Sequence, residues 1–166
     1  MKSLTIGITN LNPSWKIILD QISPPYNKIN NFSLNNLNKY SCLIIPSNFE
    51  LKKENQILEY TYEGGGIIIE SKIAKKLYNI SNQDLFVKYI DTSNDKIFSN
   101  VTPGVIDHKL NVPKNANHLQ DQYQRYLVKI TSIGKGHVII IPTDLINCIE
   151  SIENRRKNFP SENNFF

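Results

Sequence analysis

Apolar residues along this chain gather in short, uninterrupted runs. Runs rich in Ile, Leu and Val occur at residues 4–9, 41–46, 67–70 and 137–142, and each is too short to be a typical helix. Such runs are typical of parallel strands, because helices cover both faces of a parallel sheet. A more polar, alternating run over residues 26–32 predicts a further strand nearer the edge of the sheet.

Segments with helical spacing separate these runs. Residues 14–22 carry one apolar stripe at positions i, i+3, i+4 and i+7, and Asn12 is well placed as the N-cap. Helices are also expected over residues 52–63 and 72–78. We expect the three glycines at 64–66 to end the first of these, since glycine readily adopts the left-handed conformation found at helix C-termini.

The second half of the chain is more polar and alternates. Residues 86–90 and 126–130 predict strands, and the long polar stretch between them has room for short strands at 105–107 and 109–111. Residues 131–136 predict a hairpin connection into the last apolar run. The alternation of strands and helices predicts an α/β fold, a three-layer doubly wound domain whose mainly parallel sheet carries a C-terminal β-hairpin extension.

The expected domain spans residues 1–152. Thr143 and Asp144 begin its last helix, which we expect to run to about Ile152. Residues 153–166 are polar and are interpreted as a tail or linker.

Composition narrows the possible partners and the compartment. The 166 residues carry a formal net charge of +4, and the lysines are scattered rather than gathered in a stripe, which argues against nucleic acid as a partner. The one dense basic run, residues 155–157, is interpreted as part of a solvated tail. The sequence has no membrane-length apolar stretch and no apolar leader, and Cys42 and Cys148 lie in apolar surroundings. We therefore expect a cytoplasmic protein with free thiols and no membrane partner.

Motifs that resemble cofactor or metal sites have simpler explanations. The glycines at 64–66 follow a helix and precede a strand, whereas a phosphate loop follows a strand and opens a helix. The Gly134-Lys135-Gly136 motif is interpreted as a tight turn. His108, His118 and His137 lack metal-ligand spacing, so no metal and no cofactor are predicted.

The position of greatest functional interest is Glu70-Ser71, at the end of a central strand where a helix begins. Ligands of open α/β sheets bind outside the carboxyl ends of the strands. A nucleophile elbow would also occur there, but its small flanking residues are missing, and Ser71 is interpreted as a helix N-cap. No catalytic residue is predicted, and the candidate residues for binding a small polar ligand are those at the strand ends: Thr9, Asn10, Ser47, Asn48, Glu70 and Ser71.

Three passages of the chain, residues 40–47, 57–69 and 134–145, together resemble the class I glutamine amidotransferase-like superfamily, which has a flavodoxin-like fold and includes a trehalose-utilisation-like branch. Catalytic members carry a cysteine at the elbow and a later histidine and acid. Here the elbow falls at Glu70 or Ser71 with no cysteine near it, so the resemblance implies a catalytically degenerate member. Such members serve as accessory or ligand-binding domains, often in carbohydrate metabolism. Residues 155–166 resemble the junction to a downstream polysaccharide deacetylase-type catalytic domain.

Three functions remain open at this stage. The first is a non-catalytic accessory or ligand-binding module, the N-terminal part of a larger carbohydrate-active protein. The second is a free-standing hydrolase of a sugar derivative that uses Glu70 or Ser71, which requires His108 or His118 within hydrogen-bond reach of Ser71. The third is a protein-interaction domain, such as the dimerisation unit of a homodimer.

Overall fold

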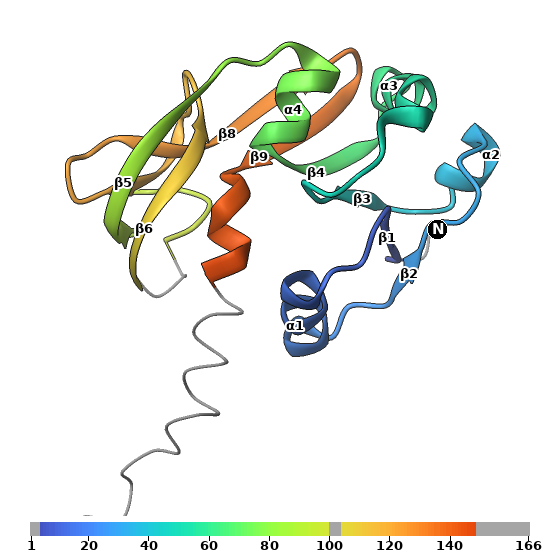
Figure 1. Cartoon of the computed structure of the whole chain (residues 1–166). Helices are drawn as coiled ribbons and strands as arrows, with labels where there is room; N and C mark the ends of the chain where they lie inside the picture. Colours follow the sequence, from blue (N-terminus) through green and yellow to red (C-terminus); the bar gives the residue numbers. More distant parts are fainter. Residues whose placement is uncertain (1–3, 100–103, 149–166) are drawn as a thin grey trace, which may run out of the picture.

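The computed structural model describes residues 4–99 and 104–148, and these form one nine-stranded mixed sheet with helices packed against it (Figure 1). The strand order is β2-β1-β3-β4-β9-β8-β7-β5-β6. The strands are β1 (Ile6–Ile8), β2 (Tyr26–Lys28), β3 (Cys42–Ile45), β4 (Gly66–Glu70), β5 (Asn82–Asp91), β6 (Gly104–Pro113), β7 (His118–Asp121), β8 (Tyr126–Ile133) and β9 (Gly136–Ile141). The helices are α1 (Pro13–Ile22), α2 (Leu34–Leu37), α3 (Glu54–Tyr62) and α4 (Ser71–Tyr78); a 3-10 turn, Leu51–Lys53, precedes α3, and residues 143–148 are also helical.

The first five strands in this order, β2, β1, β3, β4 and β9, are parallel. Side chains on one face, such as Ile8 and Ile44, pack against Trp15 of α1. On the other face, β3, β4 and β9 pack against α2, α3 and α4. Figure 1 shows α3 and α4 on one side of these strands, and α1 with the helix at 143–148 on the other. The uninterrupted apolar runs are explained by this burial on both faces.

The remaining strands are antiparallel and form the other half of the sheet. β8 pairs with β9 and β7, and β5 pairs with β7 and β6. These strands enclose a separate apolar cluster whose fully buried members include Val87, Leu110, Val112 and Leu127. β5 alternates between this cluster and solvent, with a bulge between Val87 and Tyr89.

The prediction of a three-layer, doubly wound, mainly parallel fold with a small hairpin extension is therefore wrong, and so is the flavodoxin-like description. The sheet is mixed, the described residues contain few helices, and the antiparallel strands form a continuous half of the sheet rather than an appendage. The two short strands expected at 105–107 and 109–111 are one long strand, β6, and β7 was not predicted. These strands contain many polar residues because one side faces solvent. Strands predicted from apolar residues alone are therefore too short.

Several local predictions are confirmed. The Asn12 side chain caps α1 by accepting a hydrogen bond of 2.8 Å from the Trp15 N–H. Gly64 has a φ of 115°, which ends α3 as expected. The hairpin between β8 and β9 turns at Gly134, with Gly136 packed so tightly that an added Cβ would lie 2.3 Å from the Thr61 carbonyl oxygen. The end of the predicted last helix and the whole tail lie outside the described residues.

Candidate functional site

The carboxyl ends of the parallel strands bring together the residues predicted from the sequence. Thr9 and Asn10 follow β1, Ser47 and Asn48 follow β3, and Glu70 ends β4. Two hydrogen bonds join the first two strand ends: the Thr9 N–H donates to the Ile44 carbonyl (3.1 Å), and Asn10 Nδ2 donates to the Asn48 carbonyl (3.3 Å). These residues do not form one pocket, however, because Glu70 faces α1 whereas Thr9 lines a cavity with Phe49, which packs in the cluster on the opposite face.

Glu70 is a buried carboxyl group, only 1% exposed. Its Oε1 accepts a hydrogen bond of 2.9 Å from Trp15 Nε1, and its Oε2 has no hydrogen-bond partner of normal geometry. Burial raises the pKa of Glu70, and the charge of Asp144 raises it further. The hydrogen bond from Trp15 and the contacts with Ser47 lower the pKa and so partly offset these effects. Glu70 is therefore easier to protonate than an ordinary glutamate, but it is enclosed by the protein rather than presented to a ligand.

Ser71 has a different role from the one predicted. Glu70 occupies the N-cap position of α4 and Ser71 is the first residue of the helix, so the prediction of Ser71 as N-cap is wrong. The Ser71 hydroxyl is fully buried and donates to the Asn111 carbonyl (2.6 Å), while Thr143 lies 3.0 Å away through its Oγ1. The Thr143 N–H also donates to Ser71 Oγ (3.2 Å). This hydroxyl thus joins the parallel half of the sheet to the antiparallel half.

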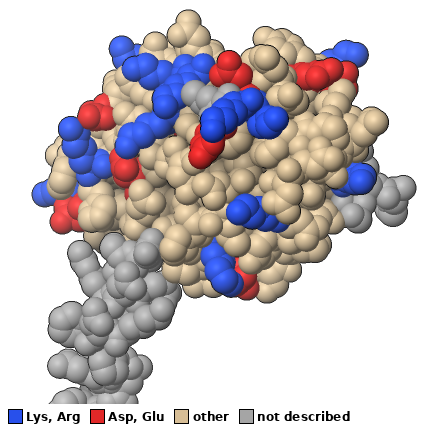
Figure 2. All heavy atoms as spheres, turned by 45° about the vertical axis from the view of Figure 1, so that its right-hand side comes forward, with Lys and Arg blue, Asp and Glu red and all other residues tan. Residues whose placement is uncertain are grey.

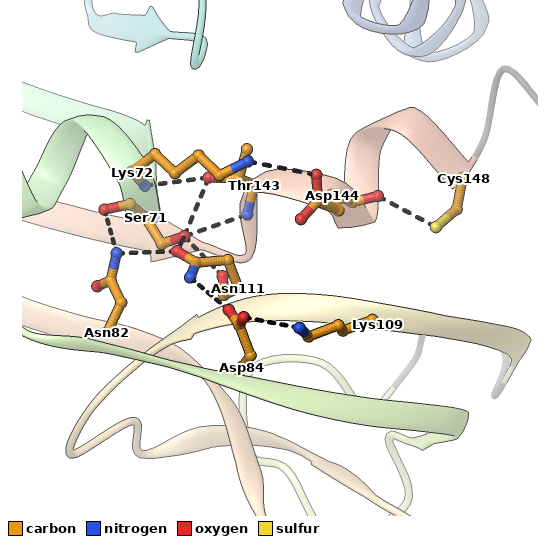
Figure 3. A network of polar contacts seen from close by, with 9 residues as sticks. All are labelled: Ser71, Lys72, Asn82, Asp84, Lys109, Asn111, Thr143, Asp144 and Cys148. Carbon is orange, nitrogen blue, oxygen red and sulfur yellow. Dashed lines mark hydrogen bonds and ion pairs between the residues drawn. The ribbon is translucent and has the colours of Figure 1, made fainter.

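A chain of amide and carboxylate groups continues from Ser71 to the surface (Figure 3). Asn82 Nδ2 donates to the Ser71 carbonyl (2.8 Å) and to Asn111 Oδ1 (2.9 Å). Asn111 Nδ2 in turn donates to Asp84 Oδ1 (2.8 Å), and Lys109 forms an ion pair of 3.0 Å with Asp84. Sequence reasoning missed these residues because their hydrogen-bond partners lie far away along the chain.

This chain lies along a wide cleft of about 750 Å³ between α4 and the β5–β6 pair. The cleft is lined by hydroxyl, amide, lysine and carboxylate side chains and one apolar side chain: Ser47, Lys72, Ile73, Lys75, Lys76, Asn79, Asn82, Gln83, Asp84 and Asn111. Hydrogen bonds from Asn111 and Lys109 lower the pKa of Asp84, so its carboxylate is ionised at neutral pH and accepts hydrogen bonds. The cleft therefore offers donors and acceptors side by side.

The described residues show no arrangement suited to covalent catalysis. His118 bonds to Asp95 (3.1 Å), His108 to the Asp107 carbonyl, and His137 to Ser132, so each described histidine makes its side-chain contact away from Ser71. Burial raises the pKa of both thiols, Cys42 and Cys148, to about 11, which leaves them protonated and unreactive at neutral pH. The described part of the chain contains no group of three or more side chains able to hold a metal ion.

Comparison with solved structures shows the same fold in bacterial proteins. The cytoplasmic protein STM3548 from Salmonella typhimurium has a TM-score of 0.59 at 12% identity over 86% of this chain and 87% of its own. The cytoplasmic protein STM1381 from Salmonella typhimurium LT2 has a TM-score of 0.58, also at 12% identity, over 90% of this chain and 93% of its own. The exo-β-1,4-mannosidase Op5Man5 from Opitutaceae bacterium strain TAV5 has a TM-score of 0.61 at 14% identity.

The mannosidase match covers 95% of this chain but 34% of the enzyme, so in that enzyme the fold is one part of a longer chain. At such low identity these likenesses show the fold alone. No model of a protein family and no curated protein sequence matches. None of these structures is described as a glutamine amidotransferase or a deacetylase, so they do not test the resemblance to those families. Within the described residues, no helix is long and apolar enough to cross a membrane.

Proposed function

We propose that this chain is a non-catalytic binding module that holds a polar, hydroxyl-rich ligand of the sugar class in the cleft between α4 and the β5–β6 pair. The observation that carries the proposal is the Asn82–Asn111–Asp84 chain along that cleft. A sugar hydroxyl both donates and accepts hydrogen bonds, and it is matched by amide and carboxylate groups whose own positions are already fixed.

The positions of these groups are fixed before any ligand arrives. Asn111 is held at both ends of its amide, by Ser71 and Asn82 at Oδ1 and by Asp84 at Nδ2. Asp84 is held by Asn111 and Lys109, yet its side chain remains 50% exposed and can accept further hydrogen bonds. A ligand would therefore bind without the entropic cost of ordering these side chains.

Two further points support a binding role beside a carbohydrate-active partner domain. The Ser71 hydroxyl is fully buried and engaged, which leaves the hydrolase alternative without an accessible nucleophile. The fold also occurs as about a third of the chain of a β-mannosidase and of a Bacillus circulans β-galactosidase, at TM-scores of 0.61 and 0.59. We propose that this module likewise works with a catalytic domain that acts on sugars, in the cytoplasm.

The test is a glycan-array screen followed by calorimetry with the full chain, using β-1,4-mannobiose and a β-galactoside as first probes. Asp84→Ala should weaken binding by about ten- to a hundredfold, because hydrogen bonds to a charged acceptor contribute about 1.5–3 kcal/mol. Asn38→Ala, which removes an exposed amide away from the cleft, is the matched control and should leave affinity unchanged. Absence of binding to any neutral glycan at millimolar concentration would overturn the proposal.

A protein-interaction role is the second candidate, and exposed aromatic side chains in the antiparallel half favour it. Phe86 and Tyr123 are 52% and 68% exposed, and both contact Arg125, which donates to the Phe86 carbonyl and lies over the Tyr123 ring. Exposed apolar patches mark interaction surfaces. Light scattering of the wild type and of the double variant Phe86→Ser/Tyr123→Ser tests this role. A wild-type dimer that dissociates in the double variant supports it.

A further inference from the structure

A second cavity, of about 310 Å³, lies at the carboxyl end of β1 and does not share a lining residue with the α4–β5 cleft. Its lining combines a strand-end hydroxyl and amide, an aromatic wall and several charges: Thr9, Asn10, Lys28, Phe32, Phe49, Glu50, Lys52 and Lys53. The carboxyl end of a parallel strand is a common place for ligands in α/β sheets.

Thr9 is the polar group whose bonding is incomplete in this cavity. The residue is 6% exposed, and its Oγ1 has no hydrogen-bond partner among the described residues, although buried hydroxyl groups are normally paired. The neighbouring Asn10 amide is already engaged, since Nδ2 donates to the Asn48 carbonyl (3.3 Å). The Thr9 hydroxyl is therefore free to donate to a ligand atom once it turns toward the cavity.

Charge at the cavity favours an anion. The lining contains three lysines, Lys28, Lys52 and Lys53, and one acid, Glu50. Glu50 pairs with Lys52 at 3.5 Å. Both members of that pair are highly exposed, so their attraction is weak and Lys52 remains able to bind another anion. Figure 2 shows both basic and acidic side chains on the face drawn, with the basic ones more numerous.

The remaining wall is aromatic. Phe32 and Phe49 lie with their ring centroids 6.0 Å apart, and Phe49 is anchored in the core that α2 and α3 cover. An apolar wall beside a cationic rim suits a compact carbon ring that bears an anionic group rather than a bare ion.

From these observations we propose that this cavity binds a small ring compound carrying a phosphate or carboxylate group. The Thr9 hydroxyl donates to the anionic group, Lys28, Lys52 and Lys53 supply the positive charge, and Phe32 and Phe49 contact the ring. The site stands apart from the sugar-binding cleft proposed above, and each can fail without the other.

The experiment titrates the ¹⁵N-labelled full chain with glucose 6-phosphate, glucuronate and neutral glucose. We expect one or both of the charged probes to shift the amide signals of Thr9, Asn10 and Lys53, and glucose to leave them unchanged. Binding of the phosphate probe alone identifies a phosphate site, and binding of glucuronate alone identifies a carboxylate site. Shifts confined to Asn82 and Asp84, or no shift at millimolar concentration, would overturn the proposal.

Variants then separate a built site from diffuse attraction. Thr9→Val removes the unpaired hydroxyl with little change in shape and should weaken binding about tenfold. Lys28→Gln should weaken it several-fold, whereas Lys135→Gln, an equal loss of charge at the exposed β8–β9 turn, should have no effect. Equal losses in the two lysine variants, or unchanged affinity in Thr9→Val, would mean non-specific attraction and would refute the assignment.

Discussion

Trp15 at the start of α1 donates its indole N–H to Glu70 at the end of β4, with 2.9 Å between Nε1 and Oε1, and this bond ties a helix to the centre of the sheet. The other carboxylate oxygen of Glu70 has no hydrogen-bond partner of normal geometry among the described residues, although Ser47 lies near the carboxyl group. The bond fixes the orientation of α1, but it leaves a poorly compensated acid in the interior, and such a group costs stability whenever it is ionised.

Glu70 should make the protein less stable as the pH rises. Its pKa in the folded state is raised by burial above the ordinary value of 4.5, so folding favours the protonated form. The stabilising contribution is complete below the unfolded pKa and is lost as the pH rises through the folded pKa. Glu70→Gln should therefore raise the free energy of unfolding at pH 7 and remove this part of the pH dependence. Urea denaturation between pH 4.5 and 8 measures the free energy of unfolding of both proteins. Glu63→Gln, which changes an exposed acid, is the control.

Ser71→Ala should lower stability by about 1–3 kcal/mol, the usual cost of leaving buried polar groups without a partner. The Asn111 carbonyl and the Thr143 hydroxyl and N–H all lose the Ser71 hydroxyl. Thermal or chemical denaturation checks the size of the effect, and Ser81→Ala, at an exposed loop position, should be neutral. A neutral result for Ser71→Ala would show that water replaces the lost hydroxyl.

Gly136→Ala should destabilise the fold by about 3 kcal/mol or prevent folding, because overpacking against backbone atoms cannot be relieved by a side-chain rotation. An added Cβ would lie 2.3 Å from the Thr61 carbonyl oxygen and 2.5 Å from that of Gly65. Gly104→Ala is the matched control, since no atom of the residues that the structure describes lies within 4 Å of its added Cβ. Circular dichroism during heating should show a lower melting temperature for the first variant and no loss for the second.

Asp121→Ala should cost about 3 kcal/mol, because it breaks a partly buried ion pair and leaves two backbone donors without an acceptor. Asp121 is 2% exposed, pairs with Arg125, and accepts the N–H groups of Tyr123 and Arg125, both at 2.9 Å. Chemical denaturation measures the loss. Glu59→Ala, the control, removes an exposed acid from α3 and should change stability by less than about 0.5 kcal/mol.

The sequence was sufficient to predict the parallel strands and parts of β5, β6 and β8, but it missed β7 and the full length of β6, and the reason is burial. Residues 67–69 are buried between helices on both faces, so every position is apolar and the pattern is unambiguous. β7 has no such signal, because it has only four residues. One of them, Leu119, has a φ of 52°, a left-handed conformation that leucine rarely adopts and that the sequence therefore does not predict.

The sequence predicted where the candidate site lies but not all of the residues that form it. The strand-end rule located Thr9, Asn10 and Glu70 at one edge of the sheet. Ser71 was given the wrong role because its partners, Asn111 and Thr143, lie far away along the chain, and local pattern carries no information about such contacts. Asn82, Asp84 and Asn111 were missed for the same reason.

The pairing of Ile67 in β4 with Val138 in β9 has a consequence for how the chain folds during synthesis. These neighbours in the sheet enclose the whole antiparallel half between them in the sequence, so on the ribosome β4 leaves the exit tunnel long before its partner exists. Until then β4 presents an unpaired apolar edge, the kind of surface that joins other chains. The nascent protein is therefore prone to aggregate until its final described strand, β9, has been made. A ribosome that stalls after α4 would release an aggregation-prone fragment rather than a half-folded domain.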